Sequence, residues 1–462
     1  MRKGLYIIVL GLMVLFISTA FRSAGRKAYV EGELLVKFND RVTAQTAARL
    51  LAANGGEVVD YFRQIDVYHV RLGGKSSVEE TLQALRAQRE VEFAEPNYLY
   101  YIDVVPNDPH FSRLWGMENT GQTGGLADAD IDASVAWEVS TGSREVVVGV
   151  IDTGIDYTHP DLADNIYTNP GEDPWANPFD PSTGNGIDDD GNGKVDDWKG
   201  WNFYAKTNDP FDDNMHGTHC AGTIGAIGNN GIGVAGVCWQ VRLMPLKFLD
   251  SRGSGATSDA VSAILYAADM GVKILNNSWG GGSQSTSMEN AIRYAANKGV
   301  LFVAAAGNEG NDNDLIPNYP SSYDLPNILA VAATDHSDNL AVWGDGGGGN
   351  DDDCGLICAT VNAGVPGSNW GYKSVHLAAP GKNILSTVPG ESYSSLSGTS
   401  MAAPHVAGAA ALLLAINPSL SVQELRSALT STVDPLESLA NKVASGGRLN
   451  LAAAVAAAAP KL

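Results

Sequence analysis

Apolar and polar positions follow two different patterns along the chain. Between residues 27 and 103, strand-like apolar segments alternate with segments of helical spacing, in the order EGELLVKF, TAQTAARLLAANG, VYHVRL, SVEETLQALRAQ and VEFAEPNYLYYI. Leu50 and Leu51 mark the apolar face of the first helical segment, and Leu82 and Leu85 mark that of the second. The order strand, helix, strand, helix, strand predicts a small α+β domain of the ferredoxin-like type over residues 27–103.

The pattern changes at about residue 104, where near-continuous apolar runs begin to alternate with amphipathic stretches. The apolar runs include VVVGVI, RLMPLKFL, KILNNSWGG, VLFVAAAGN and ILAVAATD. Helical stretches such as SDAVSAILYAADMG and MENAIRYAANKG separate them. Strands that are apolar throughout are typical of parallel sheets covered by helices on both faces. We therefore expect an α/β domain over residues 104–458, with functional groups at the carboxyl ends of its strands.

The first residues have the pattern of a secretory signal. Arg2 and Lys3 precede an apolar stretch that ends at Ile17, and small residues follow it up to Ala20. The stretch is short for a membrane-spanning helix, so an uncleaved anchor is the weaker interpretation. We predict a signal peptide over residues 1–24, secretion to the extracellular space or the periplasm, and no stable membrane association after cleavage.

The charge of the chain narrows the range of partners. There are 30 Lys and Arg residues against 52 Asp and Glu residues, a formal net charge of -22. A polyanion such as nucleic acid would be repelled, whereas divalent cations are natural partners for carboxylates. The ordinary alternative is that these acidic side chains are solvated surface groups. The composition thus argues against nucleic-acid binding and directs attention to cation sites.

Four cysteines permit one or two disulfides in an oxidising compartment. Cys354 and Cys358 could bridge a local loop, bind a metal weakly or stay free, and the local bridge is slightly favoured. Cys220 and Cys238 stand in apolar, glycine-rich segments, so we expect them to be small core residues.

Three polar residues stand where the predicted elements would bring reactive groups to one edge of the sheet. Asp152 ends the strand VVVGVI, His216 opens the helical segment HGTHCAGTIGAIG, and Ser400 follows Gly398 at the start of a long apolar helix. Each has an ordinary alternative: the Asp as a turn former, the Ser as a helix cap, and the His as a structural residue or, with His219, a metal ligand. His219 is also a weaker rival for the role of base.

The combination is more informative than its members. A serine hydroxyl becomes a nucleophile when a histidine takes its proton and a carboxylate orients that histidine. Asn308, in VLFVAAAGNEG, could donate its amide hydrogen to the oxyanion together with the backbone N–H of Ser400. We expect Pro404 in the first turn of the helix that starts near Ser400, where backbone N–H groups have no partners.

Four motifs together resemble those of the subtilase family: DTG, HGTHCAG, AAAGNEG and GTSMAAPHVAG. The resemblance extends from about Val104 to Leu451 and includes the chain order Asp, His, Ser that subtilisin has. It implies a doubly wound, mainly parallel α/β sheet and serine endopeptidase activity. It carries four roles onto this chain, with Asp152 orienting the base, His216 as the general base, Ser400 as the nucleophile and Asn308 as the oxyanion donor.

The resemblance also implies how the protein is made and what it binds. The small N-terminal domain is similar to the family's propeptide, an intramolecular chaperone and inhibitor, with cleavage expected between Tyr98 and Asn107. A peptide substrate would lie as an added strand between two backbone edges. These edges would be formed by Gly253, Ser254 and Gly255 and by Ser278, Trp279 and Gly280.

The acidic segment NGIDDDGNGKVDDW has part of the spacing of an EF-hand calcium loop. Lys199 stands where such a loop has its bidentate Glu. The segment has five Asp residues in ten positions, which would repel one another in an ordered loop unless a cation neutralised them. We predict a structural Ca²⁺ ion, against the alternative of a disordered acidic loop. The predicted ligands are Asp188, Asp190, Asn192 and Asp196.

By resemblance, a second calcium site would use Asp108, Asp161 and Asn230. The Gly- and Asp-rich stretch over residues 344–367 departs from the family pattern and lies away from the four motifs in sequence. Two rival functions are an inactive subtilase-like binding protein and a calcium-binding structural or surface protein. Since no member of the triad is missing, the sequence favours a secreted serine endopeptidase made as a zymogen.

Overall fold

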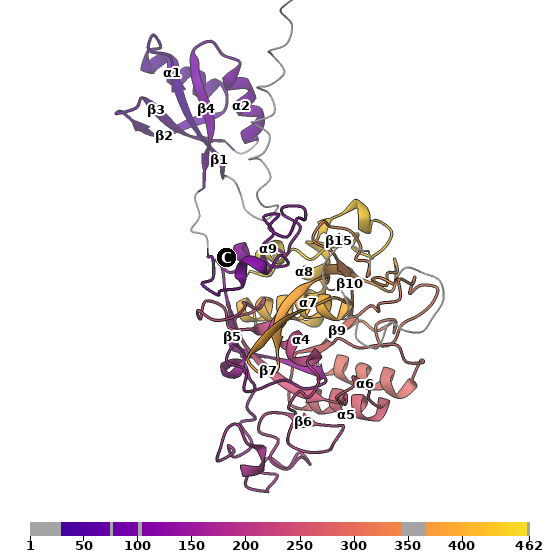
Figure 1. Cartoon of the computed structure of the whole chain (residues 1–462). Coiled ribbons are helices and arrows are strands. Elements are labelled where there is room, and N and C mark those ends of the chain that lie inside the picture. Colours follow the sequence, from indigo (N-terminus) through magenta and orange to yellow (C-terminus); the bar gives the residue numbers. More distant parts are fainter. Residues whose placement is uncertain (1–28, 74–76, 100–103, 344–365, 460–462) are drawn as a thin grey trace, which may run out of the picture. The chain divides into compact units, whose positions relative to one another are not determined.

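The computed structural model describes residues 29–73, 77–99, 104–343 and 366–459 (Figure 1). The chain divides into two units, one spanning Arg26–Ile102 and one containing Asp103–Leu462. The predicted signal peptide lies outside the described residues. So do Cys354, Cys358 and most of the Gly- and Asp-rich stretch.

The first unit is a four-stranded antiparallel sheet with two helices, in the strand order β2-β3-β1-β4. Its elements are β1 (Tyr29–Phe38), α1 (Ala44–Ala53), β2 (Gly56–Phe62), β3 (Val67–Leu72), α2 (Val78–Arg86) and β4 (Val91–Tyr98). The order βαββαβ agrees with the ferredoxin-like prediction. One strand, β2, was not predicted. It is exposed from Glu57 onwards, so no buried face imposes an alternating pattern on its sequence.

The second unit is built on a nine-stranded sheet with the strand order β14-β15-β11-β10-β9-β8-β5-β7-β6. Every pairing is parallel except that of β14 with β15. The strands of the sheet are β5 (Gly142–Asp152), β6 (Trp201–Asn202), β7 (Gln240–Lys247), β8 (Ile274–Asn277), β9 (Leu301–Ala305), β10 (Ile328–Thr334), β11 (Leu377–Pro380), β14 (Asp434–Pro435) and β15 (Gly447–Arg448). A separate hairpin comprises β12 (Ile384–Val388) and β13 (Ser392–Leu396).

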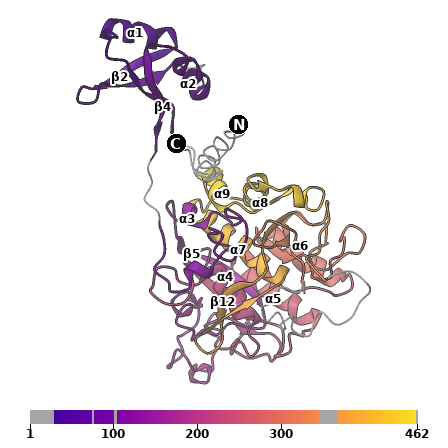
Figure 2. The same ribbon diagram turned by 45° about the horizontal axis from the view of Figure 1, so that its top comes forward.

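Helices cover both faces of this sheet (Figure 2). One apolar core contains side chains of α4 and α7 to α9, and the other contains those of α5 and α6. The helices are α3 (Ala133–Ala136), α4 (His216–Gly225), α5 (Thr257–Asp269), α6 (Thr286–Asn297), α7 (Thr399–Ile416), α8 (Val422–Ser431) and α9 (Leu451–Ala458), with short 3-10 turns η1 (Phe111–Arg113), η2 (Ala163–Asn165), η3 (Pro181–Thr183) and η4 (Glu437–Leu439).

The central strands β9 and β10 are buried at every position, which explains their largely apolar sequences, and β8 is equally buried although it ends in Asn276 and Asn277. Helix α7 is also apolar on all sides, and 83% of it is buried in the protein. Among the described residues it alone has the length and composition of a membrane span, and its burial identifies it as a core helix. The predicted doubly wound, mainly parallel α/β fold is therefore confirmed.

Candidate active site

Three of the predicted functional residues lie where elements of the second unit begin or end. Asp152 is the last residue of β5, His216 is the first of α4 and Ser400 is the second of α7. The strand end is fixed by β7, because the backbone N–H groups of Phe248 and Leu249 both donate to the Asp152 carbonyl. The site thus lies at the carboxyl edge of the parallel sheet, as expected.

Asp152 and His216 form a direct hydrogen bond. His216 Nδ1 donates to Asp152 Oδ1 over 2.8 Å, and the carboxylate is fully buried whereas 27% of the imidazole side chain is exposed. The same oxygen also accepts from the N–H of Thr153. Burial disfavours the imidazolium, but the charge of Asp152, its hydrogen bond and the neighbouring Cys220 together outweigh burial and hold the pKa of His216 well above 6.5. The carboxylate therefore orients the ring and stabilises its protonated form.

Close packing of α4 against the end of β5 makes this contact possible. A Cβ atom on Gly217 would lie 2.1 Å from the Gly154 carbonyl oxygen and 3.1 Å from Asp152 Cβ, so glycine is required there. The N–H of Gly217 donates to Thr153 Oγ1 over 2.9 Å, which ties the helix start to the strand end.

His219, the rival base, is held in the interior. Its Nε2–H donates to the carbonyls of Ile384, at 2.8 Å, and Ser394, and the ring is fully buried. Burial lowers the pKa of His219 to about 3, so it stays neutral and serves as a structural link.

Ser400 exchanges two hydrogen bonds with Ser278, which follows β8. Ser400 Oγ donates to the Ser278 carbonyl over 3.0 Å, and Ser278 Oγ donates to the Ser400 carbonyl over 2.8 Å. The Ser400 carbonyl is accessible to a side chain because Pro404, four residues later, has no N–H to offer it. Cys220 Sγ also donates to this carbonyl, at 3.4 Å. Pro404 is the sixth residue of α7, so the prediction that it lies in the first turn was wrong.

Asn308 lies in the loop after β9 and faces the start of α7. Its Oδ1 accepts from the N–H of Thr399 at 2.9 Å and from Thr399 Oγ1 at 3.1 Å, so its amide nitrogen is left to donate elsewhere. A Cβ atom on Gly398 would lie 3.6 Å from Asn308 Nδ2 and also 3.6 Å from the Ser400 backbone nitrogen. The first N–H of α7, that of Thr399, is thus taken by Asn308, and the cap residue Gly398 has no side chain to occupy the next one, that of Ser400.

The two predicted substrate edges are joined by an aromatic contact. Phe248, before Gly253–Gly255, packs edge-on against Trp279 with ring centroids 4.9 Å apart. Both edges need small residues, because a Cβ atom on Gly255 would lie 2.4 Å from the Phe248 carbonyl and one on Gly280 would lie 2.6 Å from Asn318 Oδ1.

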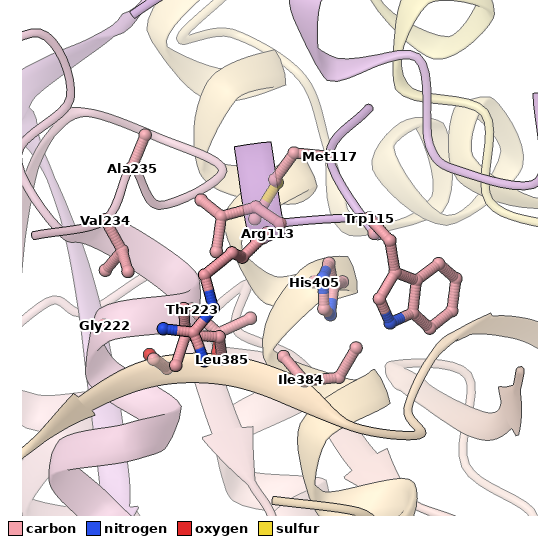
Figure 3. Close-up of a pocket in the computed structure, with 13 residues that line it drawn as sticks. Arg113, Trp115, Met117, Gly222, Thr223, Val234, Ala235, Ile384, Leu385 and His405 are labelled. Carbon is pink, nitrogen blue, oxygen red and sulfur yellow. The ribbon is translucent and has the colours of Figure 1, made fainter. Parts of the chain in front are cut away.

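A small cavity of about 10 Å³ lies between the η1 segment, α4, β12 and α7 (Figure 3) and is lined by none of the four candidate catalytic residues. His405, on α7, lines it and donates from Nδ1 to the Met401 carbonyl. The cavity has room for one water molecule at most, whereas small-molecule sites occupy roughly 300–1,000 Å³. It is a packing defect rather than a substrate pocket.

The acidic loop gathers carboxylates from a wider stretch of sequence than was predicted. Ligand atoms of Glu172, Asp188 and Asp190 lie within 4.8 Å of one another. Burial, reinforced by the neighbouring charges of Asp197 and Asp190, raises the pKa of Glu172 to about 6. Asn192 joins the group, because its Nδ2 donates to Asp190 Oδ2 and Asp197 Oδ2 at 2.9 Å each. Such repulsion between acidic groups favours a bound cation.

The structure does not bring Asp196 into this group. Both oxygens of Asp196 accept from the N–H of Gly186, whereas the next residue, Asp197, is fully buried and accepts from Asn192 and Asn169. Sequence reasoning also missed Glu172. The segment NPGEDPW before the acidic run offered two acidic side chains, Glu172 and Asp173, as a signal, but their distance along the chain hid the contact.

The residues predicted for a second calcium site lie in a buried, hydrogen-bonded setting. Asp108 and Asp161 are 4% and 0% exposed, and burial raises the pKa of both. Asn230 Nδ2 donates to Asp161 Oδ1 over 2.7 Å, and the Asp108 carboxylate accepts from the N–H of Asn229. The other Asp108 oxygen is buried without a partner, which leaves an acceptor for a cation.

Comparisons with known proteins identify the family of the chain. Residues 143–451 match the subtilase family, and residues 17–97 match the fervidolysin N-terminal prodomain. The chain is 37% identical to a thermophilic serine proteinase of Bacillus sp. (strain AK1), over 88% of this chain and 84% of that protein. It is 35% identical to thermitase of Thermoactinomyces vulgaris, over 76% of this chain and 99% of that protein.

A solved structure of a protease from Pseudoalteromonas arctica PAMC 21717 superposes with a TM-score of 0.56 and 30% identity, covering 77% of this chain and 99% of that one. The family expected from the four motifs is thus confirmed. The chain belongs to the subtilase family and is a subtilisin-like serine endopeptidase with an N-terminal prodomain.

Proposed function

We propose that this chain is a secreted endopeptidase in which Asp152, His216 and Ser400 form the catalytic triad and Asn308 stabilises the oxyanion. The observation that carries this proposal is the 2.8 Å hydrogen bond from His216 Nδ1 to a buried Asp152 oxygen. That bond fixes the tautomer in which His216 Nε2 is unprotonated and able to accept a proton.

Acylation begins when Ser400 Oγ attacks the carbonyl carbon of the scissile peptide bond. The hydroxyl proton passes to His216 Nε2, and Asp152 stabilises the resulting imidazolium. For this step the Ser400 hydroxyl exchanges its acceptor, from the Ser278 carbonyl to His216 Nε2. Such hydrogen bonds commonly form only in the substrate complex.

The oxyanion then lies between Asn308 Nδ2 and the N–H of Ser400. Both donors are fixed before substrate arrives, because Thr399 holds the Asn308 oxygen and α7 holds the Ser400 backbone. The tetrahedral intermediate collapses as His216 donates its proton to the leaving amine. Water, deprotonated by the same histidine, then releases the acyl group and restores Ser400.

The substrate would lie as an added strand between residues 253–255 and 278–280. Backbone pairing of this kind accepts many sequences, and the aromatic contact between Phe248 and Trp279 supports a shared apolar wall between the two edges. The prodomain, over residues 27–103, acts as an intramolecular inhibitor until cleavage between Tyr98 and Asn107 releases the peptidase domain, over residues 104–458.

The proposal also includes export of the protein through a signal peptide and the binding of structural Ca²⁺. The basic and apolar pattern of residues 1–24 supports a cleaved signal peptide, and the cell wall-associated protease of Bacillus subtilis (strain 168) is 34% identical over 78% of this chain. Ca²⁺ would be held by Glu172, Asp188, Asp190 and Asp197, with Asn192, and by Asp108 and Asp161, with Asn230. When bound, it would neutralise the buried carboxylates and stabilise both loops.

Labelling with a fluorophosphonate probe tests the proposal directly. The mature protein should be labelled at Ser400 and should hydrolyse casein, whereas Ser400→Ala should lose labelling, hydrolysis and prodomain cleavage together. An unlabelled parent protein that still binds Ca²⁺ would instead support the inactive calcium-binding alternative. Casein cleavage by Ser400→Ala at the parental rate would overturn the assignment of the nucleophile.

A further inference from the structure

The loop that carries Asn308 has no regular secondary structure of its own. It follows β9 and includes Gly307 and Gly310, which both have positive φ angles, 113° and 72°. Thr399 orients the Asn308 side chain, but that contact alone does not fix the backbone from which the side chain extends. Some other part of the protein must hold this loop in place.

The segment from Gly367 to Trp370 lies alongside the loop and pairs with it. The Gly310 N–H donates to the Gly367 carbonyl at 2.9 Å, and the Trp370 N–H donates to the Asn311 carbonyl at 3.0 Å. Parallel bridges join Glu309 with Gly367 and Asp312 with Trp370. The two segments therefore form a short two-stranded clamp beside the active site.

Asn369, at the centre of this clamp, directs every side-chain hydrogen bond at the loop. Its Oδ1 accepts from the N–H groups of Glu309 and Asn311, each at 2.9 Å. Its Nδ2 donates to Glu309 Oε2 at 2.8 Å and to Asn313 Oδ1 at 3.1 Å. Two accepted and two donated bonds are the full capacity of an amide side chain. Asn369 is 1% exposed, so water cannot replace these bonds without rearrangement.

These contacts reach the backbone of Asn308 on both sides. The N–H of Asn308 donates to Glu309 Oε2 at 3.0 Å, the same oxygen that accepts from Asn369. The preceding carbonyl, of Gly307, accepts from the Asn369 N–H at 2.8 Å. Trp343 Nε1 donates to the Asn308 carbonyl at 3.2 Å. Removing the Asn369 amide would leave the Glu309 carboxylate and the two loop N–H groups without this shared partner.

We propose that Asn369 is a positioning residue that holds the oxyanion-binding amide of Asn308 at its working distance. The inference rests on the proposed role of Asn308, and Asn369 itself touches no substrate. An oxyanion donor works only when it is already at hydrogen-bonding distance from the developing charge. Displacement of a catalytic group by 1 Å can cost about 10²-fold in rate.

The experiment compares Asn369→Ala with a matched control, Asn327→Ala. Asn327 is also 1% exposed, and its amide donates to two buried carbonyls, those of Ile292 and Val300, at the amino end of β10. Immobilised parent enzyme removes the prodomain of each variant, and endpoint fluorophosphonate labelling gives the active concentration. We then measure kcat and KM on a peptide p-nitroanilide, and Tm.

Asn369→Ala should lower kcat by about 10- to 10²-fold with KM changed less than threefold. Asn327→Ala should lower Tm and leave kcat within twofold. The double variant Asn308→Ala/Asn369→Ala distinguishes positioning from general damage. In the Asn308→Ala background, Asn369→Ala should still lower Tm but should lower kcat by less than threefold, because the donor that it positions is gone.

The outcomes separate this inference from the proposed function. If Asn308→Ala keeps full kcat, the oxyanion role itself fails. If Asn308→Ala lowers kcat by about 10²- to 10³-fold but Asn369→Ala does not lower it, only the positioning role fails. If Asn369→Ala lowered kcat equally in the parent enzyme and in the Asn308→Ala variant, the inference would also be overturned. The loss would then not depend on the Asn308 side chain.

Discussion

Gly217→Ala should separate His216 from Asp152 without removing either residue. The new methyl group would lie 2.1 Å from the Gly154 carbonyl oxygen, whereas carbon and oxygen atoms ordinarily approach to about 3.3 Å. The obstructing atom belongs to the backbone, so it cannot rotate away, and the start of α4 must move by roughly 1 Å. Displacing the His216 ring by that amount would stretch the 2.8 Å bond to Asp152 beyond hydrogen-bonding distance.

We expect Gly217→Ala to lower kcat by about 10²- to 10³-fold, which is about 2.7–4 kcal/mol in activation free energy. Weaker contact with Asp152 should also lower the pKa of His216, so the acid limb of the kcat/KM profile should move to lower pH. Both are measured on a peptide p-nitroanilide between pH 5 and 10, with Tm recorded for each protein.

Gly225→Ala is the matched control at the other end of α4. Its new methyl would lie 2.4 Å from a methyl of the Val241 side chain, so stability should fall while kcat stays within threefold. If Gly217→Ala retained parental kcat and the parental acid limb, close packing of α4 would not be what sets the geometry of the pair.

Two further predictions concern pH and calcium. Because His216 must be neutral to accept a proton and its pKa lies well above 6.5, kcat/KM should still be rising with pH at pH 6.5 and should level off only at higher pH. Asp152→Asn should move this limb to lower pH and reduce kcat by about 10⁴-fold, and an unmoved limb would contradict the cause given for the shift. Chelation of Ca²⁺ should lower Tm, by the equivalent of about 2.7 kcal/mol at 100 times the Kd, and Asp188→Ala with Asp190→Ala should abolish part of this dependence. An identical Tm with and without chelator would remove both metal sites.

The local pattern of apolar and polar residues was sufficient to predict most strands and helices of the larger domain. The runs that form β9 and β10 are buried on both sides, so burial alone imposes their largely apolar sequences. The same reasoning missed β2, because an exposed strand has no buried face that would require apolar residues at regular positions. The sequence pattern also placed Pro404 in the first turn of α7, where prolines are common. A proline inside the helix is tolerated here because Ser278 Oγ donates to the Ser400 carbonyl, and the sequence does not show that contact.

The sequence by itself determined the family, the parallel α/β architecture and the residues of the proposed triad, because their motifs are local and their strand ends share one edge. Only the tertiary structure decided which atoms meet. It paired His216 with Asp152 and buried His219 against two carbonyls, and it brought Glu172 to the acidic loop and paired Asn192 with Asp197. It also placed Asn369 against the loop of Asn308, 61 residues earlier in the chain. Such contacts depend on how separate elements pack, and no periodic pattern in the sequence records them.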